Sequence, residues 1–329
     1  MLIVLNAWGQ RLAALVLLIL LTAAPALQAE TVPPAVVAPP TVVRIGWLRA
    51  PNDITLAKAH GSLEAALQPH NARVEWVGPF AAAAPAQEAI NAGSIDITAG
   101  SSTAAVSALA AHIPMVVFAY QKMAPGAEAI LVKQDSPIHS LKDLIGRRVA
   151  VNRGGTGEYL LVRALEMQGI DPASVTRRYL SPADSGSAFD QGHVDAWATW
   201  DPFVAMAVHA YGARVLADGA AIGSENAVVL IAHRDFATGQ RALLQVIFET
   251  LIAENTWSQS HQAEAGAIWT GEMAIPETLA AEIGAHNAVP TRAVTAADQA
   301  QIADIADWSL ANHIVPTLPD VAAGVITLP

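Results

Sequence analysis

Short apolar runs alternate with helical segments over the first third of the chain. Strands are predicted for VVRIGWL (42–48), RVEWV (73–77), IDIT (95–98) and MVVFAY (115–120). Helices are predicted between them, over residues 55–67, 84–92 and 102–111. Strands that alternate with helices form parallel sheets covered by helices, so we expect an α/β lobe here.

The same alternation starts again after residue 127. Further strands are predicted over residues 128–132, 148–152, 176–180, 194–199, 214–217 and 227–233, with a helix over 158–168. We expect the strand 227–233 to run back toward the first set. After Arg234 we expect helices without further strands, over residues 235–259, 261–270, 276–286 and 295–312.

The predicted fold class is therefore α/β, with two lobes, each a mainly parallel sheet flanked by helices, and a helical C-terminal region. Lobe 1 is assigned residues 42–121 and 234–329, and lobe 2 residues 122–233. Ligands of such sheets bind outside the carboxyl ends of the strands, so we expect a binding cleft between the lobes.

Residues 1–29 have the pattern of a secretory signal peptide. Arg11 precedes an apolar run, Leu12–Leu21, and small residues follow, so cleavage is expected near Ala26–Ala29. A membrane anchor is the alternative, but it would need about 20 apolar residues. Residues 30–41 are rich in proline and predict an extended lead-in. We expect export into a bacterial periplasm.

Composition and charge exclude several classes of protein. The chain has 329 residues and no cysteine, which excludes disulfides, thiolate metal sites and a lipoprotein anchor. Its net charge of −11 argues against nucleic-acid binding, which needs a basic surface. The histidines lack the H-x-H and H-E-x-x-H spacings, and no G-x-S-x-G elbow is present. We therefore expect no metal, no cofactor and no catalytic residue.

The stretch AVNRGGTGEY (150–159) places Gly154, Gly155 and Thr156 between a strand and a helix. It is not a dinucleotide fingerprint, because Leu160 stands where the third glycine belongs, and no lysine follows as a P-loop requires. A helix N-terminus with exposed N–H groups binds small anions. The alternative is a turn in which glycines only relieve strain. Glu158, in the first helical turn, would repel a nearby anion.

A second strand-to-helix junction, DITAGSST (96–103), carries Gly100, Ser101, Ser102 and Thr103. An N-cap is the alternative role of Ser101 or Ser102. Together, the two junctions would present N–H and O–H donors from two lobes to an oxyanion with several acceptor oxygens.

Arg49 and Trp200 are two further candidates for ligand binding. Arg49 follows the first strand, where its guanidinium could pair with an oxyanion or be a solvated surface group. Trp200 ends a strand and is expected to line the cleft and cover an apolar part of a ligand. For Trp197 a place in the core is the leading alternative.

Four blocks carry a resemblance to a known family. They are EAINAGSIDI (88–97), AEAILVKQDSPIHSLKDLIGRRVAVNRG (127–154), YLLVRALEMQGI (159–170) and YLSPADSGSAFDQGHVDAWATWDPF (179–203). In their order and spacing, residues 42–315 resemble the solute-binding proteins of ABC importers in the aliphatic sulfonate, taurine and nitrate group, and above all the aliphatic sulfonate binders.

The resemblance implies a type II periplasmic binding protein fold with two crossover strands. It implies a small anionic solute, an aliphatic sulfonate first of all, held by Gly100–Thr103 and Gly154–Thr156, with Trp200 and Asp201 in the cleft wall. Hinge closure would trap the solute, and the closed form, expected to be a monomer, would dock on a membrane permease. Taurine, a sulfate ester, nitrate and bicarbonate are the alternative ligands.

The sequence departs from the family pattern near the expected site. The family's Tyr-Gln-Lys is Trp47-Leu48-Arg49 here, and its Gly-Asp-Thr-Pro-Pro is Ser101-Ser102-Thr103-Ala104-Ala105. Gly155 replaces a serine, and Gly186 replaces an arginine. The resemblance thus implies the fold and the transport role but leaves the ligand open.

Enzymes also occur among relatives of this architecture, namely a sulfinate desulfinase and a thiamin-pyrimidine synthase. The desulfinase uses a cysteine nucleophile, which this chain lacks, and the synthase is cytosolic, whereas this chain carries an export pattern. We therefore expect a binding protein and not an enzyme.

Overall fold

The computed structural model describes residues 39–329. The predicted signal peptide and nearly all of the lead-in lie outside these residues. Within the described range, none of the helices combines the length and the apolar character that crossing a membrane would need.

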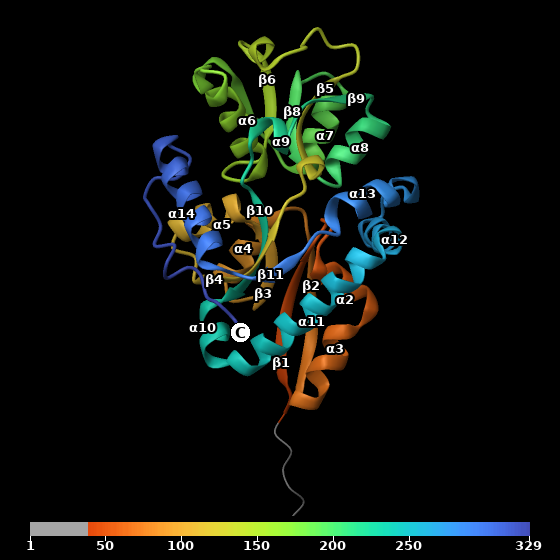
Figure 1. Cartoon of the computed structure of the whole chain (residues 1–329), viewed down its shortest axis with the longest axis vertical. Helices are drawn as coiled ribbons and strands as arrows, with labels where there is room; N and C mark the ends of the chain where they lie inside the picture. The colour runs from red at the N-terminus through yellow and green to blue at the C-terminus, as the bar shows by residue number, and fades with distance from the viewer. Residues whose placement is uncertain (1–38) are drawn as a thin grey trace, which may run out of the picture. The chain divides into compact units, whose positions relative to one another are not determined.

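The first sheet has six strands in the order β11-β4-β10-β3-β1-β2 (Figure 1). Its strands are β1 (Thr41–Leu48), β2 (Ala72–Phe80), β3 (Ile97–Ser101), β4 (Met115–Lys122), β10 (Ala227–His233) and β11 (Thr291–Ala293). Its helices are α2 (Asp53–His60), α3 (Ser62–Leu67), η1 (Gln68–His70), α4 (Ala83–Asn91), α5 (Ser102–Ala110), α10 (Arg234–Gly239), α11 (Arg241–Ser260) and α14 (Ala296–Ala311). The central strands β3, β4 and β10 are almost wholly buried because helices cover both faces of the sheet, whereas the edge strand β2 carries exposed polar residues.

The second sheet has five strands in the order β7-β6-β8-β5-β9. Its strands are β5 (Glu128–Lys133), β6 (Arg148–Val151), β7 (Thr176–Tyr179), β8 (Ala196–Trp200) and β9 (Ala213–Asp218). Its helices are η2 (Pro125–Ala127), η3 (Leu141–Leu144), α6 (Thr156–Met167), η4 (Pro172–Ser174), α7 (Pro182–Asp190), α8 (Phe203–Ala210) and α9 (Gly219–Ile222). Separate apolar clusters fill its two faces, one beneath α6 and one beneath α7 and α8.

The chain crosses twice between the sheets, after β4 and before β10, and Figure 1 shows both crossings. In each sheet the strand that follows a crossing lies between two other strands and runs in the opposite direction to both. β5 runs antiparallel to β8 and β9, and β10 runs antiparallel to β3 and β4. The strands on either side of each inserted strand keep one common direction, so the expected parallel pattern is interrupted only where the lobes are joined and at the edge strand β11, which runs antiparallel to β4.

The element boundaries differ from the sequence predictions in two instructive places. The helix predicted over residues 55–67 is broken at Gly61, whose φ of +68° ends α2 in a left-handed cap. The expectation of no strand after Arg234 is wrong, because Thr291–Ala293 pairs with β4 as β11. Three residues are too short for a periodic pattern, and pairing with β4 determines this strand. Strand β10, which the predicted division assigns to lobe 2, pairs within the first sheet.

The C-terminal helices form a cluster of their own beside α2 and α8. It contains α12 (Gln262–Met273), η5 (Glu277–Leu279) and α13 (Ala280–Asn287). Apolar side chains of α12 and α13 pack against Leu56 of α2 and against Ala205 and Met206 of α8. This cluster therefore contacts both lobes.

A buried carboxylate at the start of α2 forms hydrogen bonds with α11 and β11. Asp53 is 3% exposed, and its carboxylate accepts hydrogen bonds from Asn255 Nδ2 (3.0 Å) and Thr291 Oγ1 (2.7 Å). Burial raises the pKa of Asp53 from 3.8 to about 6, against the opposing effect of these hydrogen bonds. The protonated carboxyl thus favours the folded state, fully so below about pH 4, and the contribution is lost as the pH rises through about 6.

We expect Asp53→Asn to remove this pH dependence. An asparagine can still accept from Asn255 and donate to Thr291 without a buried charge. Between about pH 4 and pH 7 the wild type should lose about 3 kcal/mol of unfolding free energy relative to the variant, at about 1.4 kcal/mol per pH unit of pKa shift. Urea unfolding at both pH values measures the difference, and parallel pH profiles for the two proteins would contradict it.

Asp298 provides a control of opposite sign. Burial acts to raise the pKa of Asp298, but hydrogen bonds from Arg292 and Thr295 outweigh it and lower the pKa to about 2. The ionised carboxylate therefore stabilises the fold above about pH 4, and this contribution is lost as the pH falls through about 2. Asp298→Asn should lose stability at neutral pH, and its deficit should shrink in acid.

Candidate ligand-binding site

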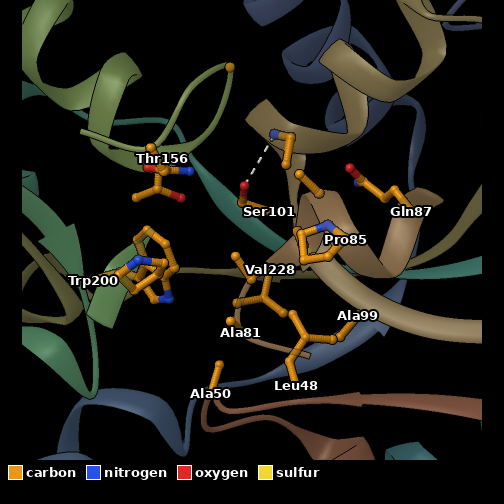
Figure 2. A pocket seen from close by; sticks show the side chains of 18 of the residues that line it. Leu48, Ala50, Ala81, Pro85, Gln87, Ala99, Ser101, Thr156, Trp200 and Val228 are labelled. Atoms are coloured by element: carbon orange, nitrogen blue, oxygen red, sulfur yellow. Dashed lines mark hydrogen bonds between the residues drawn. The ribbon is translucent and has the colours of Figure 1, made fainter. Parts of the chain in front are cut away.

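A cavity of about 380 Å³ lies between the two sheets, and both lobes contribute to its wall. Lobe 1 supplies the ends of β1 and β3, the loop before α4 and the first turns of α4 and α5. Lobe 2 supplies the loops that follow β6, β7 and β8. The carboxyl ends of these strands thus meet at one place, as expected for open α/β sheets. Figure 2 shows Trp200 and Thr156 on one side of the pocket and Pro85 and Gln87 on the other.

Six of the ten candidate residues line this cavity: Gly100, Ser101, Gly154, Thr156, Trp200 and Asp201. Ser102, Thr103 and Gly155 lie beside the lining residues in the same two junctions. Arg49 lies apart from them. Its side chain is exposed, and its N–H donates to the carbonyl oxygen of Phe80 (3.0 Å), so it occupies the surface position that was its alternative.

The junction before α6 leaves backbone donors available to a ligand. Gly155 is the N-cap of α6 and offers no side-chain cap. The N–H of Gly154 donates to Glu158 Oε2 (2.8 Å), and that of Gly157 donates to Asn152 Oδ1 (2.7 Å). Within residues 39–329, the N–H groups of Gly155 and Thr156 have no acceptor. They form the positive end of the helix dipole, which suits an anion.

The sequence suggested that Glu158 would repel a bound anion, but its carboxylate is engaged by other groups of the protein. Its buried carboxylate accepts hydrogen bonds from Arg177 Nη1 (3.1 Å), Tyr179 OH (2.5 Å) and the N–H of Gly154. Its charge is therefore paired with Arg177 on β7, and it holds the glycine turn in place.

The junction before α5 combines capping with a place in the cavity wall. Ser101 is the N-cap of α5, with its Oγ accepting from the N–H of Ala104 (3.2 Å, dashed in Figure 2), so the capping alternative is observed. Ser102 Oγ donates to Asn226 Oδ1 (3.1 Å), and Thr103 Oγ1 lies 3.3 Å from the same oxygen. The hydroxyls of Ser102 and Thr103 are thus directed to Asn226 behind the wall.

Asn226 joins the two junctions. It is 1% exposed, and its Nδ2 donates to Thr156 Oγ1 (3.0 Å) and to Glu128 Oε2 (3.0 Å), while its Oδ1 faces Ser102 and Thr103. Burial raises the pKa of Glu128. Asn226 was not among the residues predicted from the sequence, because it lies more than a hundred residues from Ser102. Its place directly before the apolar strand 227–233 was the available signal.

Arg153 was also missed, although it begins the glycine junction. Its guanidinium lies over the ring of Tyr179, 3.6 Å from the centroid, and both residues line the cavity. Among the lining residues that the structure describes, Arg153 is the one Lys or Arg. It therefore supplies a positive charge, as an anion site requires, from the same loop that ends in the free N–H groups of α6.

Trp200 is half-buried and lines the cavity, with its ring edge-to-face against Phe203 at a centroid distance of 5.7 Å. Trp197 is 2% exposed and packs against Phe189 and Phe203. It thus lies in the core, which was the alternative to a place in the cleft. The opposite wall is apolar and consists mostly of alanine. Its residues are Leu48, Ala50, Ala81, Ala82, Ala83, Ala84, Pro85, Ala99 and Val228.

Asp201 directs its charge away from the cavity. Its buried carboxylate accepts from His286 Nδ1 (3.0 Å) and Asn287 Nδ2 (3.2 Å) of α13, and from the N–H of Ala205 (3.3 Å). Burial raises the pKa of Asp201, with His286 acting against it, and the hydrogen bond to Asp201 raises the pKa of His286. Asp201 therefore fixes the segment after β8 against α13.

The arrangement can hold a small anion that carries an apolar part. Arg153, the N–H groups of Gly155 and Thr156 and the hydroxyl of Thr156 belong to the junction before α6, and apolar side chains of lobe 1 line the opposite wall. In the described part of the chain no three histidine or carboxylate side chains gather as a metal site would need.

Comparison with known proteins places these features in a family. The family described as NMT1/THI5 like matches residues 73–251, more than half of the chain. The aliphatic sulfonates-binding protein of Escherichia coli (strain K12) is 33% identical over 286 residues, which cover 86% of this chain and 88% of that protein.

Solved structures agree with this relationship. The alkanesulfonate-binding protein SsuA from Xanthomonas axonopodis pv. citri, bound to MOPS, matches with a TM-score of 0.81 at 29% identity, over 88% of this chain and 99% of that one. The periplasmic aliphatic sulphonate binding protein SsuA from Escherichia coli matches with a TM-score of 0.78 at 32% identity, over 88% and 93%. The desulfurization enzyme DszB, at 13% identity and a TM-score of 0.63 over 87% of this chain and 96% of that one, shares the fold alone.

These similarities confirm the two-lobe periplasmic binding protein fold that the resemblance implied. The chain belongs to the NMT1/THI5-like family, in the group that holds the aliphatic sulfonate-binding proteins.

Proposed function

We propose that this chain is the periplasmic substrate-binding protein of an ABC importer, and that it binds an organic sulfonate in the cavity and delivers it to a membrane permease. One observation carries the proposal. The N-terminus of α6 offers the N–H groups of Gly155 and Thr156 beside the guanidinium of Arg153, opposite an apolar wall. The sulfonate-binding relatives support the same ligand class.

A sulfonate matches this end of the cavity in charge and shape. Its three oxygens can accept from the two N–H groups and from Arg153 at once, and it stays ionised at any physiological pH. Its carbon chain would lie against the small side chains of Ala81–Ala84 and Pro85 and the ring of Trp200. No bond is made or broken in this role.

Two alternative ligand types suit the cavity less well. Nitrate and bicarbonate would leave the apolar wall unoccupied. Taurine carries an ammonium group that needs a carboxylate, and Asp201, the acidic residue in the described lining, is already bonded to His286 and Asn287. An alkanesulfonate without a second charge is therefore the preferred ligand.

Binding and release require the lobes to close and part, and several contacts join them in this structure. Ser107 Oγ of α5 donates to the carbonyl oxygen of Gly154 (2.7 Å). Trp308 Nε1 of α14 donates to Glu166 Oε2 of α6 (2.6 Å). The pair formed by Asp201 and His286 links β8 to α13. These contacts support the view that the structure has the closed arrangement.

We expect short alkanesulfonates to raise the melting temperature of the protein. A ligand at 100 times its Kd adds about 2.7 kcal/mol of stability, and each kcal/mol shifts the midpoint by about 2–4 °C for a chain of this size. A thermal-shift panel should show this with pentanesulfonate and much smaller effects with taurine, nitrate and bicarbonate. A panel in which no sulfonate shifts the midpoint would contradict the proposed ligand class.

Arg153→Gln should weaken sulfonate binding about ten- to hundredfold, because it removes a charge-assisted hydrogen bond to the head group. Isothermal titration calorimetry of pentanesulfonate measures the loss. Arg147→Gln is the matched control, since Arg147 is exposed at the other end of β6 and does not line the cavity. Equal Kd values for Arg153→Gln and Arg147→Gln would rule out a head group at this position.

Sulfonate affinity should fall as the pH rises above about 6.5, the ordinary pKa of histidine. The pKa of His286 is raised by Asp201, and the nearby Glu282 acts in the same direction, so we expect protonated His286 to favour closure. That contribution is present below the ordinary pKa and is lost as the pH rises through the raised one. Calorimetry from pH 5 to 9 should show a smaller decline for His286→Gln than for the wild type, and identical pH profiles would contradict it.

A further inference from the structure

Gln87 is a buried polar residue in the wall of the cavity with unmet hydrogen-bonding capacity. It lies on α4, is 3% exposed and lines the cavity. Its amide nitrogen is buried, and no acceptor within residues 39–329 reaches it. Figure 2 shows the amide end of Gln87 turned toward the other labelled residues of the pocket. A buried amide without a partner is costly, and such a group calls for an explanation.

The other lining side chains that carry an amide or a hydroxyl group differ from Gln87 in that each forms a hydrogen bond within the protein. They are Asn52, Ser101, Ser107, Asn152, Thr156, Tyr179, Ser181 and Asn287. They shape the loops around the cavity. Gln87 is therefore the amide of the apolar wall whose nitrogen has no partner within residues 39–329, and a turn of the amide would bring this buried nitrogen to the cavity.

The position of Gln87 separates it from the anion-binding end. A Cβ atom at Gly100 would lie 3.5 Å from Nε2 of Gln87 and 3.2 Å from Cβ of Ala83, so the amide sits beside the apolar wall. In Figure 2, Ser101 lies between Gln87 and Thr156, which begins α6. The amide of Gln87 would thus meet the tail of a ligand whose head lies at α6.

We propose that Gln87 is a specificity-determining residue that hydrogen-bonds a neutral oxygen, an ether or a hydroxyl, in the tail of the bound sulfonate. This inference rests on the proposed function. A half-turn about the last torsion of Gln87 exchanges its nitrogen and oxygen at small cost, so the amide can donate to an ether or accept from a hydroxyl. The tail oxygen is uncharged, because the charged groups of the described lining, Arg153 and Asp201, lie outside this wall.

Four sulfonates of equal heavy-atom number test the proposal: 1-pentanesulfonate, 2-ethoxyethanesulfonate, 3-methoxypropane-1-sulfonate and 4-hydroxybutane-1-sulfonate. The last three replace one carbon of the first with oxygen at successive positions. Calorimetry on the wild-type protein should give at least one oxygen-containing ligand a Kd about three- to tenfold lower than that of pentanesulfonate, as one net hydrogen bond provides. In Gln87→Leu that preference should disappear, and pentanesulfonate should bind at least as tightly as in the wild type.

Protein stability separates this role from a structural one. Ligand-free Gln87→Leu should melt at or above the wild-type temperature, since it removes a buried group without a partner. Gln121→Leu is the matched control. Gln121 is 5% exposed, and its Nε2 donates to the carbonyl oxygen of Val289 (2.8 Å), so this variant should melt lower yet keep the ligand preference. Gln87→Met, with an unbranched side chain of similar length, serves as the second variant if Gln87→Leu folds poorly.

The outcomes distinguish this inference from the function on which it rests. An unchanged ratio of Kd values in Gln87→Leu and Gln87→Met would overturn the role of Gln87 and leave sulfonate binding intact. A wild-type protein that binds pentanesulfonate more tightly than all three oxygen-containing ligands would overturn it as well. A wild-type protein that binds none of the four would overturn both proposals.

Discussion

The geometry of the site depends on one buried amide. Asn226 receives hydrogen bonds from hydroxyls at the start of α5 and donates to Thr156 at the start of α6, and it also donates to Glu128 at the start of β5. In this structure Asn226 thereby joins two helix N-termini from different lobes at the cavity. A fully satisfied buried network of this kind fixes one arrangement, because every alternative leaves a polar group without a partner.

The electrostatics of the cavity follow from this frame. Glu158 is paired with Arg177, and Asp201 is bonded to α13, so both nearby carboxylates are engaged away from the cavity. The cavity wall instead contains Arg153, whose guanidinium lies over Tyr179, and the N–H groups at the start of α6. A chain of net charge −11 thus presents a local positive potential where an anion would bind. The small side chains of Ala81–Ala84 leave room for its tail.

Local signals in the sequence predicted the elements and the two junctions, since period, glycine position and capping residues act over a few neighbours. Contacts that join distant segments could not be predicted in this way. Asn226 meets Ser102 and Thr156 only through the fold, and β11 exists because β4 offers it an edge. Arg153 and Gln87 were visible as residues, but their roles depend on a ring and a wall supplied by other parts of the chain.

The proposed binding mode places a sulfonate head at the N-terminus of α6. A crystal structure of the protein with 1-pentanesulfonate would show whether the head group lies there. We expect sulfonate oxygens within hydrogen-bond distance of the N–H groups of Gly155 and Thr156 and of Arg153, with the carbon chain against Ala81–Ala84 and Trp200. A head group bound elsewhere in the cavity, away from α6 and Arg153, would contradict it.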